Sequence, residues 1–238
     1  MLQLYVAQDR CGWVDPSGGS HWDLDGDFDK RLERCIEDAA KAWPRRAWRR
    51  TRVQVWGAGG LCRPFLLGPV AGLKGVDEIR SFARSQVANA TGWDEPCEVR
   101  LEGDITKGVV LATAIPTSVH AQIETLIRSA KLRLVSLRPW WAGALDEALA
   151  TQPAPELLVI EEPDGLTLLA GRDGAWSLAE VFSPKPAADE PERTVRRLAA
   201  GVAIPPDAST WLRLNPATLE GPRAPWPGVE RQSFGDRA

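Results

Sequence analysis

The chain has 238 residues, of which 44% are hydrophobic and 26% charged, and its formal net charge is −3. This length allows one large domain or two small ones with a substantial core, and the composition is that of an ordinary globular protein. The charge argues against a general nucleic-acid binder, which is usually basic over a whole face. No apolar run approaches a membrane span and no secretory signal is recognisable, so we expect a cytoplasmic protein.

The hydrophobic periodicity predicts alternating strands and helices along the first 150 residues. A strand, a polar turn and a second strand occupy 2–14, and a helix covers 27–43, where apolar residues recur every three or four positions. The remaining predicted elements of this half are strands at 51–56 and 62–67, a helix at 76–90, strands at 98–101 and 108–115, a helix from 117, a strand at 132–137 and a helix at 141–149.

The second half repeats the opening theme. Residues 156–170 again combine an apolar strand, a polar turn and a second strand. A hinge is expected at 151–155, between the halves. The rest of this half is predicted to contain strands at 157–161, 166–170 and 176–182, a helix at 192–201 and a strand at 210–214. Proline, glycine and charge dominate from 215 onward, so we expect the tail 215–238 to be disordered.

The glycine cluster 57–60 follows a strand, which is where a dinucleotide-binding G-x-G-x-x-G would lie. Here Cys62 occupies the third glycine position, and Arg63-Pro64 prevents the helix that would hold a pyrophosphate. We therefore reject that site and predict a hairpin turn. The four cysteines form no C-x-x-C pair, which predicts reduced, buried thiols. They are Cys11, Cys35, Cys62 and Cys97.

Two charged clusters have a functional and an ordinary interpretation. Asp23, Asp25, Asp27 and Asp29 could give oxygen ligands to calcium, but an EF-hand would need glycine and glutamate where Phe28 and Arg34 stand. The alternative is a polar loop with Asp27 as a helix N-cap. The basic segment 41–52 could bind phosphate, anionic lipid or an acidic partner. Its alternative is a solvated loop balanced by the acidic segment before it.

The sequence offers few candidates for catalysis. His120 and Glu124 form an i,i+4 pair, but there is no H-E-x-x-H zinc motif. No G-x-S-x-G elbow and no G-x-x-x-x-G-K-[ST] loop is present either. A hydrolase or a P-loop enzyme is therefore not expected.

Residues 108–149 run as an apolar strand ending at Pro116, a helix beginning Thr117-Ser118-Val119, the stretch 129–141 (Ser-Ala-Lys-Leu-Arg-Leu-Val-Ser-Leu-Arg-Pro-Trp-Trp) and Ala144-Leu145. This order resembles type IV pilus assembly protein M and the cytoplasmic part of the type II secretion L protein. The resemblance extends over most of 1–214. It implies a two-lobed α/β architecture of the actin-like (ribonuclease H-like) class, with mixed sheets and flanking helices. The first lobe would be 1–150 with an inserted subdomain at about 57–115, and 151–214 would be a reduced second lobe.

In actin-like proteins two D-x-G turns hold the phosphates and magnesium of a nucleotide. The corresponding turns here are Gln8-Asp9-Arg10-Cys11-Gly12 and Glu161-Glu162-Pro163-Asp164-Gly165. Bulky residues replace the glycines that allow backbone to approach a phosphate, and Pro163 removes one N–H donor. Nucleotide binding is therefore expected to be weak or lost. If Mg-ATP does bind, the resemblance implies Asp9, Asp164 and Gly165 as its contacts.

The resulting hypothesis is a non-enzymatic cytoplasmic scaffold of a bacterial pilus or secretion-like machine, without a cofactor. Its expected partner is another protein component of the machine; no nucleic acid is expected, and contact with the inner membrane would come only through that partner. Two alternatives remain. One is an actin-like ATPase that binds Mg-ATP through Asp9 and Asp164, and the other is a calcium-dependent module that uses the aspartates of 23–29.

Overall fold

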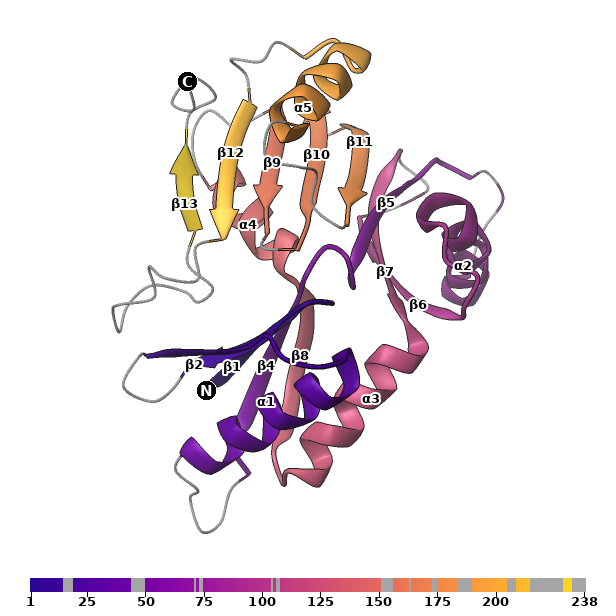
Figure 1. The fold of residues 1–238 in the computed structure, drawn as a ribbon. Coiled ribbons are helices and arrows are strands. Elements are labelled where there is room, and N and C mark those ends of the chain that lie inside the picture. The colour runs from indigo at the N-terminus through magenta and orange to yellow at the C-terminus, as the bar shows by residue number, and fades with distance from the viewer. Residues whose placement is uncertain are drawn as a thin grey trace.

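The chain forms two five-stranded mixed sheets, a small three-stranded sheet and five helices in the part that the structure describes (Figure 1). The structure is a computed structural model, and it describes residues 1–14, 19–43, 50–70, 72, 75–103, 105, 108–150, 156–162, 164–172, 175–183, 190–204, 209–214 and 229–232. Within these residues, no helix combines the length and the apolar character needed to cross a membrane.

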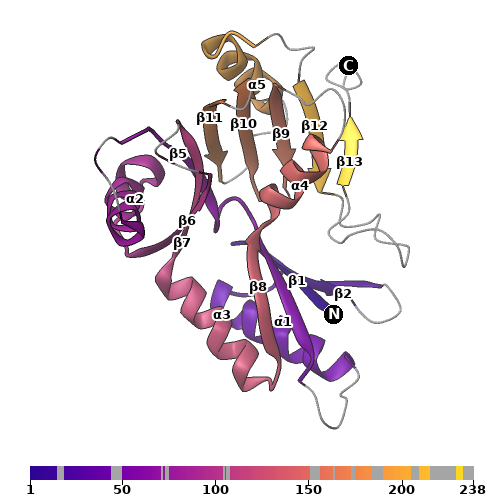
Figure 2. The ribbon, with the colours of Figure 1, turned by 180° about the vertical axis from the view of Figure 1, so that it is seen from behind.

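The first lobe contains a sheet of strand order β3-β2-β1-β4-β8. Its first three strands form an antiparallel meander, and β4 and β8 then add in parallel beyond β1. Helices α1 and α3 cover one face of this sheet (Figures 1 and 2). The bounds are β1 Leu2–Val6, β2 Cys11–Val14, β3 Ser20–Asp23, α1 Phe28–Ala42, β4 Arg52–Gly57, α3 Thr117–Ser129 and β8 Arg133–Pro139.

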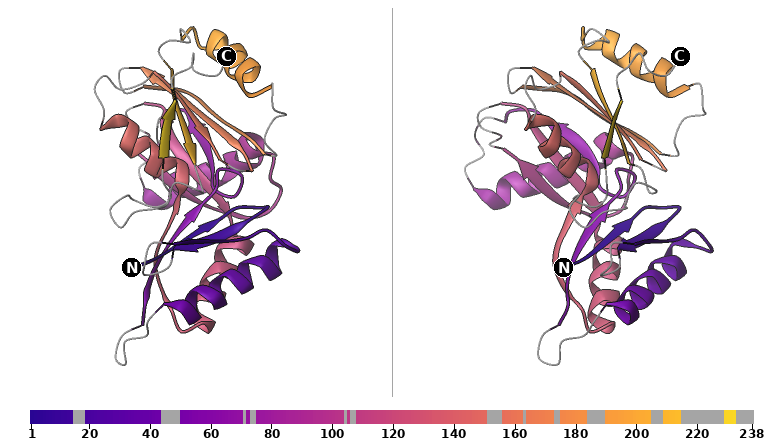
Figure 3. Two further views of the ribbon diagram at one scale, coloured as in Figure 1. Left: turned by 60° about the vertical axis from the view of Figure 1, so that its left-hand side comes forward. Right: turned by 90° about the vertical axis from the view of Figure 1, so that its left-hand side faces the viewer.

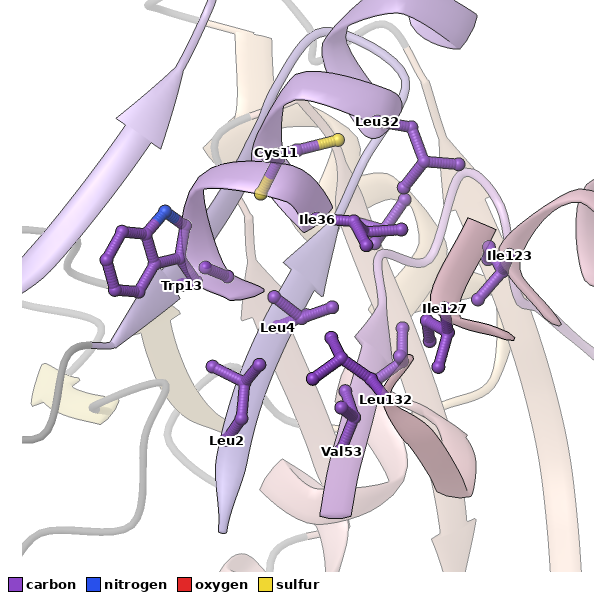
Figure 4. Packing of buried hydrophobic residues seen from close by; sticks show 14 of the residues in the cluster. Leu2, Leu4, Cys11, Trp13, Leu32, Ile36, Val53, Ile123, Ile127 and Leu132 are labelled. Carbon is purple, nitrogen blue, oxygen red and sulfur yellow. The ribbon is translucent and has the colours of Figure 1, made fainter. Parts of the chain in front are cut away.

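The hydrophobic core of this lobe follows from the side-chain repeat of two residues in its strands and of three to four residues in its helices. Alternate residues of β1 and β4 point toward the helices, and residues three or four apart on α1 and α3 point back. Asp27 caps α1 by accepting the N–H of Lys30 at 3.0 Å. The side chains that meet in this layer include Leu2, Leu4, Leu32, Ile36, Val53, Ile123 and Ile127 (Figure 4).

A small subdomain is inserted between β4 and α3. Its sheet has the order β5-β7-β6, all antiparallel, and α2 packs on it through Ala83 and Val87. The bounds are β5 Arg63–Leu67, α2 Val76–Thr91, β6 Cys97–Glu102 and β7 Val110–Pro116. Strand β5 lies beside β11 of the second lobe, which places the subdomain against both lobes (Figure 1).

The second lobe repeats the strand arrangement of the first. Its sheet has the order β11-β10-β9-β12-β13, where β9, β10 and β11 form a meander and β12 pairs in parallel with β9. The repeat ends at the fifth strand, because β13 is antiparallel to β12 whereas β8 is parallel to β4. The bounds are β9 Leu157–Glu161, β10 Leu166–Arg172, β11 Ala175–Phe182, α5 Glu190–Gly201, β12 Ser209–Leu214 and β13 Val229–Gln232.

Two helices cover opposite faces of the second sheet (Figures 2 and 3). Helix α5 packs on the face of Val159 and Leu168, and α4 (Trp140–Leu149) packs on the face of Leu158 and Ile160. The layer under α4 also includes Tyr5 of the first lobe. Helix α4 therefore builds the hydrophobic junction between the lobes.

Two expectations need correction. The glycine cluster 57–60 is not a hairpin turn, because β4 pairs with β1 and β8 while β5 pairs with β7 in another sheet. Part of the tail expected to be disordered forms a strand, β13, on the edge of β12. The expected hinge 151–155, the tail residues 215–228 and 233–238, and most of the basic segment (44–49) lie outside the described residues.

Candidate functional site

The β1–β2 turn and the β9–β10 turn face each other across the junction between the lobes. Each turn is closed by its own backbone: Ala7 N–H donates to Arg10 O at 2.9 Å, and Glu162 N–H donates to Gly165 O at 2.9 Å. The Gln8 N–H of the first turn donates to Asp164 Oδ2 of the second at 3.3 Å. The structure thus brings together the two turns that the sequence identified.

The carboxylate of Glu162 is the centre of this junction. Its side chain lies at the end of β9 and is only 1% exposed. Oε1 accepts the hydroxyl of Tyr5 at 3.1 Å, and Oε2 accepts the N–H of Gly59 at 2.8 Å. Thr167 of β10 adds a longer contact from its hydroxyl to Oε2, at 3.5 Å. Two of the three donors belong to the first lobe or the turn that leaves it, so this carboxylate bonds across the junction.

Gly59 is required by this close approach. A Cβ atom built on Gly59 would lie 2.2 Å from Thr167 Oγ1 and 2.8 Å from Glu162 Oε2. Such separations are too short for non-bonded heavy atoms, so any other L-residue here would displace the side chains of Thr167 and Glu162. The glycine cluster therefore serves packing between the lobes.

Burial and charge repulsion raise the pKa of both carboxyl groups in the second turn. The pKa of Glu162 is raised to about 8, first by desolvation and then by the charge of Asp164. The pKa of Asp164 is raised to about 6, again by desolvation and then by the charge of Asp9. The hydroxyl of Tyr5 has a pKa raised well above its ordinary value, so it stays protonated and donates. The pair therefore titrates near neutral pH.

The predicted site residues lie close together but in unlike environments. The Asp9 side chain is 46% exposed and pairs with Arg10, whose Nη2 lies 2.9 Å from Asp9 Oδ2. Asp164 is 7% exposed, and its Oδ1 has no hydrogen-bond partner within the described part of the chain. Gly165 closes the second turn through its carbonyl and its N–H.

A buried arginine holds the first turn from behind. Arg31 of α1 is 5% exposed, and its guanidinium donates to Gln8 O at 3.1 Å and to Gly26 O at 2.5 Å. The bond to Gln8 O holds the first turn on its carbonyl side, and the bond to Gly26 O ties it to the loop before α1.

Two backbone N–H groups at this junction that could face the phosphates of a nucleotide are paired within the chain. A phosphate between these turns would need free backbone N–H donors. The Gln8 and Gly59 N–H groups already donate to Asp164 and Glu162. The junction is thus filled by groups of the chain itself.

The other candidates from the sequence do not converge on a site. Asp23 binds Arg34 at 2.8 Å, Asp27 caps α1, and Asp29 accepts the amide of Gln122 at 3.0 Å. The described residues contain no group of three or more His, Cys, Asp or Glu side chains placed to hold a metal ion. All four cysteines are buried and free.

His120 ties the small subdomain to the first lobe. Its Nδ1 lies 2.9 Å from Glu98 Oε1 on β6, whereas Glu124 is 4.0 Å from Nε2. The i,i+4 pair seen in the sequence is therefore the weaker of its two contacts.

Tyr5, Gly59 and Glu162 were not predicted as site residues. The one signal in the sequence was the run of small residues 57–60 after a strand, which was interpreted as a local turn. In the chain, Glu162 is 157 positions from Tyr5 and 103 positions from Gly59, so local sequence patterns could not reveal these contacts.

Comparison with known proteins identifies the fold. No protein-family model and no curated protein matches the sequence. Solved structures do match, and three of them are informative about the fold. The Vibrio cholerae EpsL cytoplasmic domain, from an inner-membrane component of the type II secretion system, has a TM-score of 0.50 and 8% identity over 81% of this chain and 73% of that chain. A Bacteroides thetaiotaomicron protein with an actin-like ATPase fold and unknown function has a TM-score of 0.55 and 12% identity over 87% and 79%.

The third is a PilM–PilN type IV pilus biogenesis complex, with a TM-score of 0.52 and 13% identity over 85% of this chain and 71% of that chain. The chain therefore has an actin-like fold that resembles those of PilM and the EpsL cytoplasmic domain, which confirms the predicted fold class.

Proposed function

We propose that this actin-like chain is a non-enzymatic scaffold of a bacterial pilus or secretion-type machine, where it binds another protein component without using Mg-ATP. The observation that carries the proposal is the junction between the lobes. Two backbone N–H groups that could hold phosphate, those of Gln8 and Gly59, donate instead to carboxyl groups of the chain. With these donors paired inside the chain, we infer that the fold serves to bind another protein.

The structural neighbours supply the kind of partner. One solved neighbour is a complex of two pilus biogenesis proteins, and another is the cytoplasmic domain of an inner-membrane component of a secretion system. By analogy of fold, the partner here would be another protein component of such a machine. This chain would then be a cytoplasmic protein that reaches the inner membrane through that partner.

The nucleotide part of the proposal is tested by a thermal melt with and without millimolar Mg-ATP. A ligand that binds only the folded state stabilises it by about 2.7 kcal/mol at a hundredfold excess over its dissociation constant. We expect no shift in melting temperature. A clear rise that is abolished by Asp9→Ala or Asp164→Ala would contradict the proposal and favour the ATPase.

One observation favours that rival function. The charge of Asp9 raises the pKa of Asp164, so the two aspartates that would flank magnesium are within electrostatic reach of each other. Direct titration calorimetry with Mg-ADP, which needs no change in stability, therefore accompanies the melt.

The partner part is tested with the cytoplasmic segments of pilus and secretion membrane proteins from the same organism. Each segment is titrated into the protein in Mg-ATP and, separately, in EDTA. The proposal expects saturable binding of one segment with the same dissociation constant in both buffers. Binding that requires Mg-ATP, or no binding to any segment of the set, would contradict it.

A further inference from the structure

We propose that Glu162 is an interlobe clamp: its carboxyl group joins the two lobes from within, at the place where an actin-like fold would hold a nucleotide. The clamp consists of Glu162, the Tyr5 hydroxyl and the Gly59 N–H. The inference does not depend on the proposed function, because it concerns the ligand-free protein alone.

The direction of the hydrogen bonds supports the clamp. The acceptor comes from the second lobe, at the end of β9, and the donors come from β1 and from the turn after β4. Both donors are buried with their acceptor; Tyr5 is 0% and Glu162 1% exposed. If the lobes separated without water entering, the hydrogen bonds from Tyr5 and Gly59 to Glu162 would be lost, so opening carries a cost that closure removes.

The preceding residue shows that burial of a glutamate is not sufficient for this role. Glu161 is also buried, at 4% exposed, and it also accepts a hydrogen bond from an aromatic side chain, from Trp211 Nε1 at 3.0 Å. Both Glu161 and Trp211 belong to the second sheet, on β9 and β12. Glu161 therefore joins strands within one lobe, and Glu162 joins the two lobes.

The clamp also explains the shape of the chain around it. Gly59 has no space for a Cβ atom because Thr167 and Glu162 lie against its backbone. The adjoining indole of Trp141 in α4 donates to Cys62 O at 2.7 Å, which fixes the same turn from the other side. The turn 58–62 is thus held between α4 and the second lobe, so the Gly59 N–H remains aimed at Glu162 Oε2.

The test compares Glu162→Ala with Glu161→Ala in the full chain, without nucleotide or partner. Spin labels on Glu33→Cys of α1 and Arg197→Cys of α5 report the separation of the lobes. Both positions are exposed, and the four native thiols are buried. Amide hydrogen exchange at Gly59 reports the clamp itself.

We expect Glu162→Ala to lengthen and broaden the distance distribution and to raise Gly59 exchange by about tenfold or more, which corresponds to the loss of roughly one net hydrogen bond. Glu161→Ala is expected to leave both readouts at the wild-type value, although it destabilises the second lobe. Equal effects of the two variants, or an unchanged distance and exchange in Glu162→Ala, would overturn the proposal.

Two milder variants keep the test decisive if Glu162→Ala does not fold. Glu162→Gln keeps the length of the side chain and one acceptor oxygen, and Tyr5→Phe keeps the ring but removes one donor. Each should raise Gly59 exchange less than alanine does, while Glu161→Gln should not raise it. If neither milder variant differs from Glu161→Gln, the clamp is refuted. This failure is distinct from failure of the scaffold function, which would appear as Mg-ATP binding to the unmodified protein.

Discussion

The turn of the first lobe exposes its aspartate, whereas the turn of the second lobe buries two carboxyl groups. Asp9 is 46% exposed and pairs with a neighbouring arginine at the surface, while Glu162 and Asp164 are 1% and 7% exposed. The strands on either side of the two turns are arranged alike. The repeated architecture therefore places two turns together, and side-chain chemistry then makes one the donor of hydrogen bonds and the other the acceptor.

The strongest way to break this arrangement is to add one carbon between the lobes. Gly59→Ala would place a Cβ atom 2.2 Å from Thr167 Oγ1, and such overpacking destabilises by about 1–3 kcal/mol or more. Chemical denaturation measures the change. Gly68→Ala is the matched control, since a Cβ atom there meets nothing within 4 Å. A loss at Gly68 as large as at Gly59 would show that close approach of the lobes is not the cause.

A smaller loss is expected when one donor of the first lobe is removed. Tyr5→Phe deletes the hydroxyl that donates to Glu162 at 3.1 Å but keeps the buried ring, and loss of such a bond costs about 1–2 kcal/mol. A double-mutant cycle of Tyr5→Phe with Glu162→Gln measures the coupling. Strictly additive effects would contradict a direct bond between the lobes.

The β9–β10 turn, which contains Glu162 and Asp164, should also make the stability of the protein depend on pH. The pKa of Glu162 is raised from 4.5 to about 8 and that of Asp164 from 3.8 to about 6. The folded state then keeps protons that the unfolded chain releases, so the free energy of unfolding falls as pH rises through this window. The facing titratable and charged groups are Tyr5, Cys62, Asp9 and Arg10.

We therefore expect a higher melting temperature at about pH 5.5 than at about pH 8.5, and a flatter profile in Glu162→Gln. Carboxylates with a lowered pKa, such as Asp23, act only at more acidic pH. Glu161→Gln is the control and should keep the wild-type slope. A melting temperature that rises with pH would contradict the buried pair.

The sequence predicted the parts of this molecule that local patterns determine. The apolar spacing and the Asp27 cap predicted α1 to within a residue at each end, and the likeness of 2–14 to 156–170 predicted two equivalent hairpins. Pairing between distant strands was not predictable locally, so the glycine cluster was interpreted as a hairpin. The clamp was missed for the same reason. Nothing in the residues around Glu162 indicates that Tyr5 and Gly59 supply its donors.

The smallest expected effect is at the exposed turn. Asp9→Asn removes a surface ion pair, and such changes alter stability by less than about 0.5 kcal/mol. Its charge nevertheless raises the pKa of Asp164, so the variant should lower that pKa, as measured by carbon NMR titration of the Asp164 carboxyl. A large loss of stability would mean that the first turn is also a structural part of the junction. An unchanged Asp164 pKa would mean that the charge of Asp9 does not act on the β9–β10 turn. The two turns would then interact only through hydrogen bonds, with the β1–β2 turn as donor and the β9–β10 turn as acceptor.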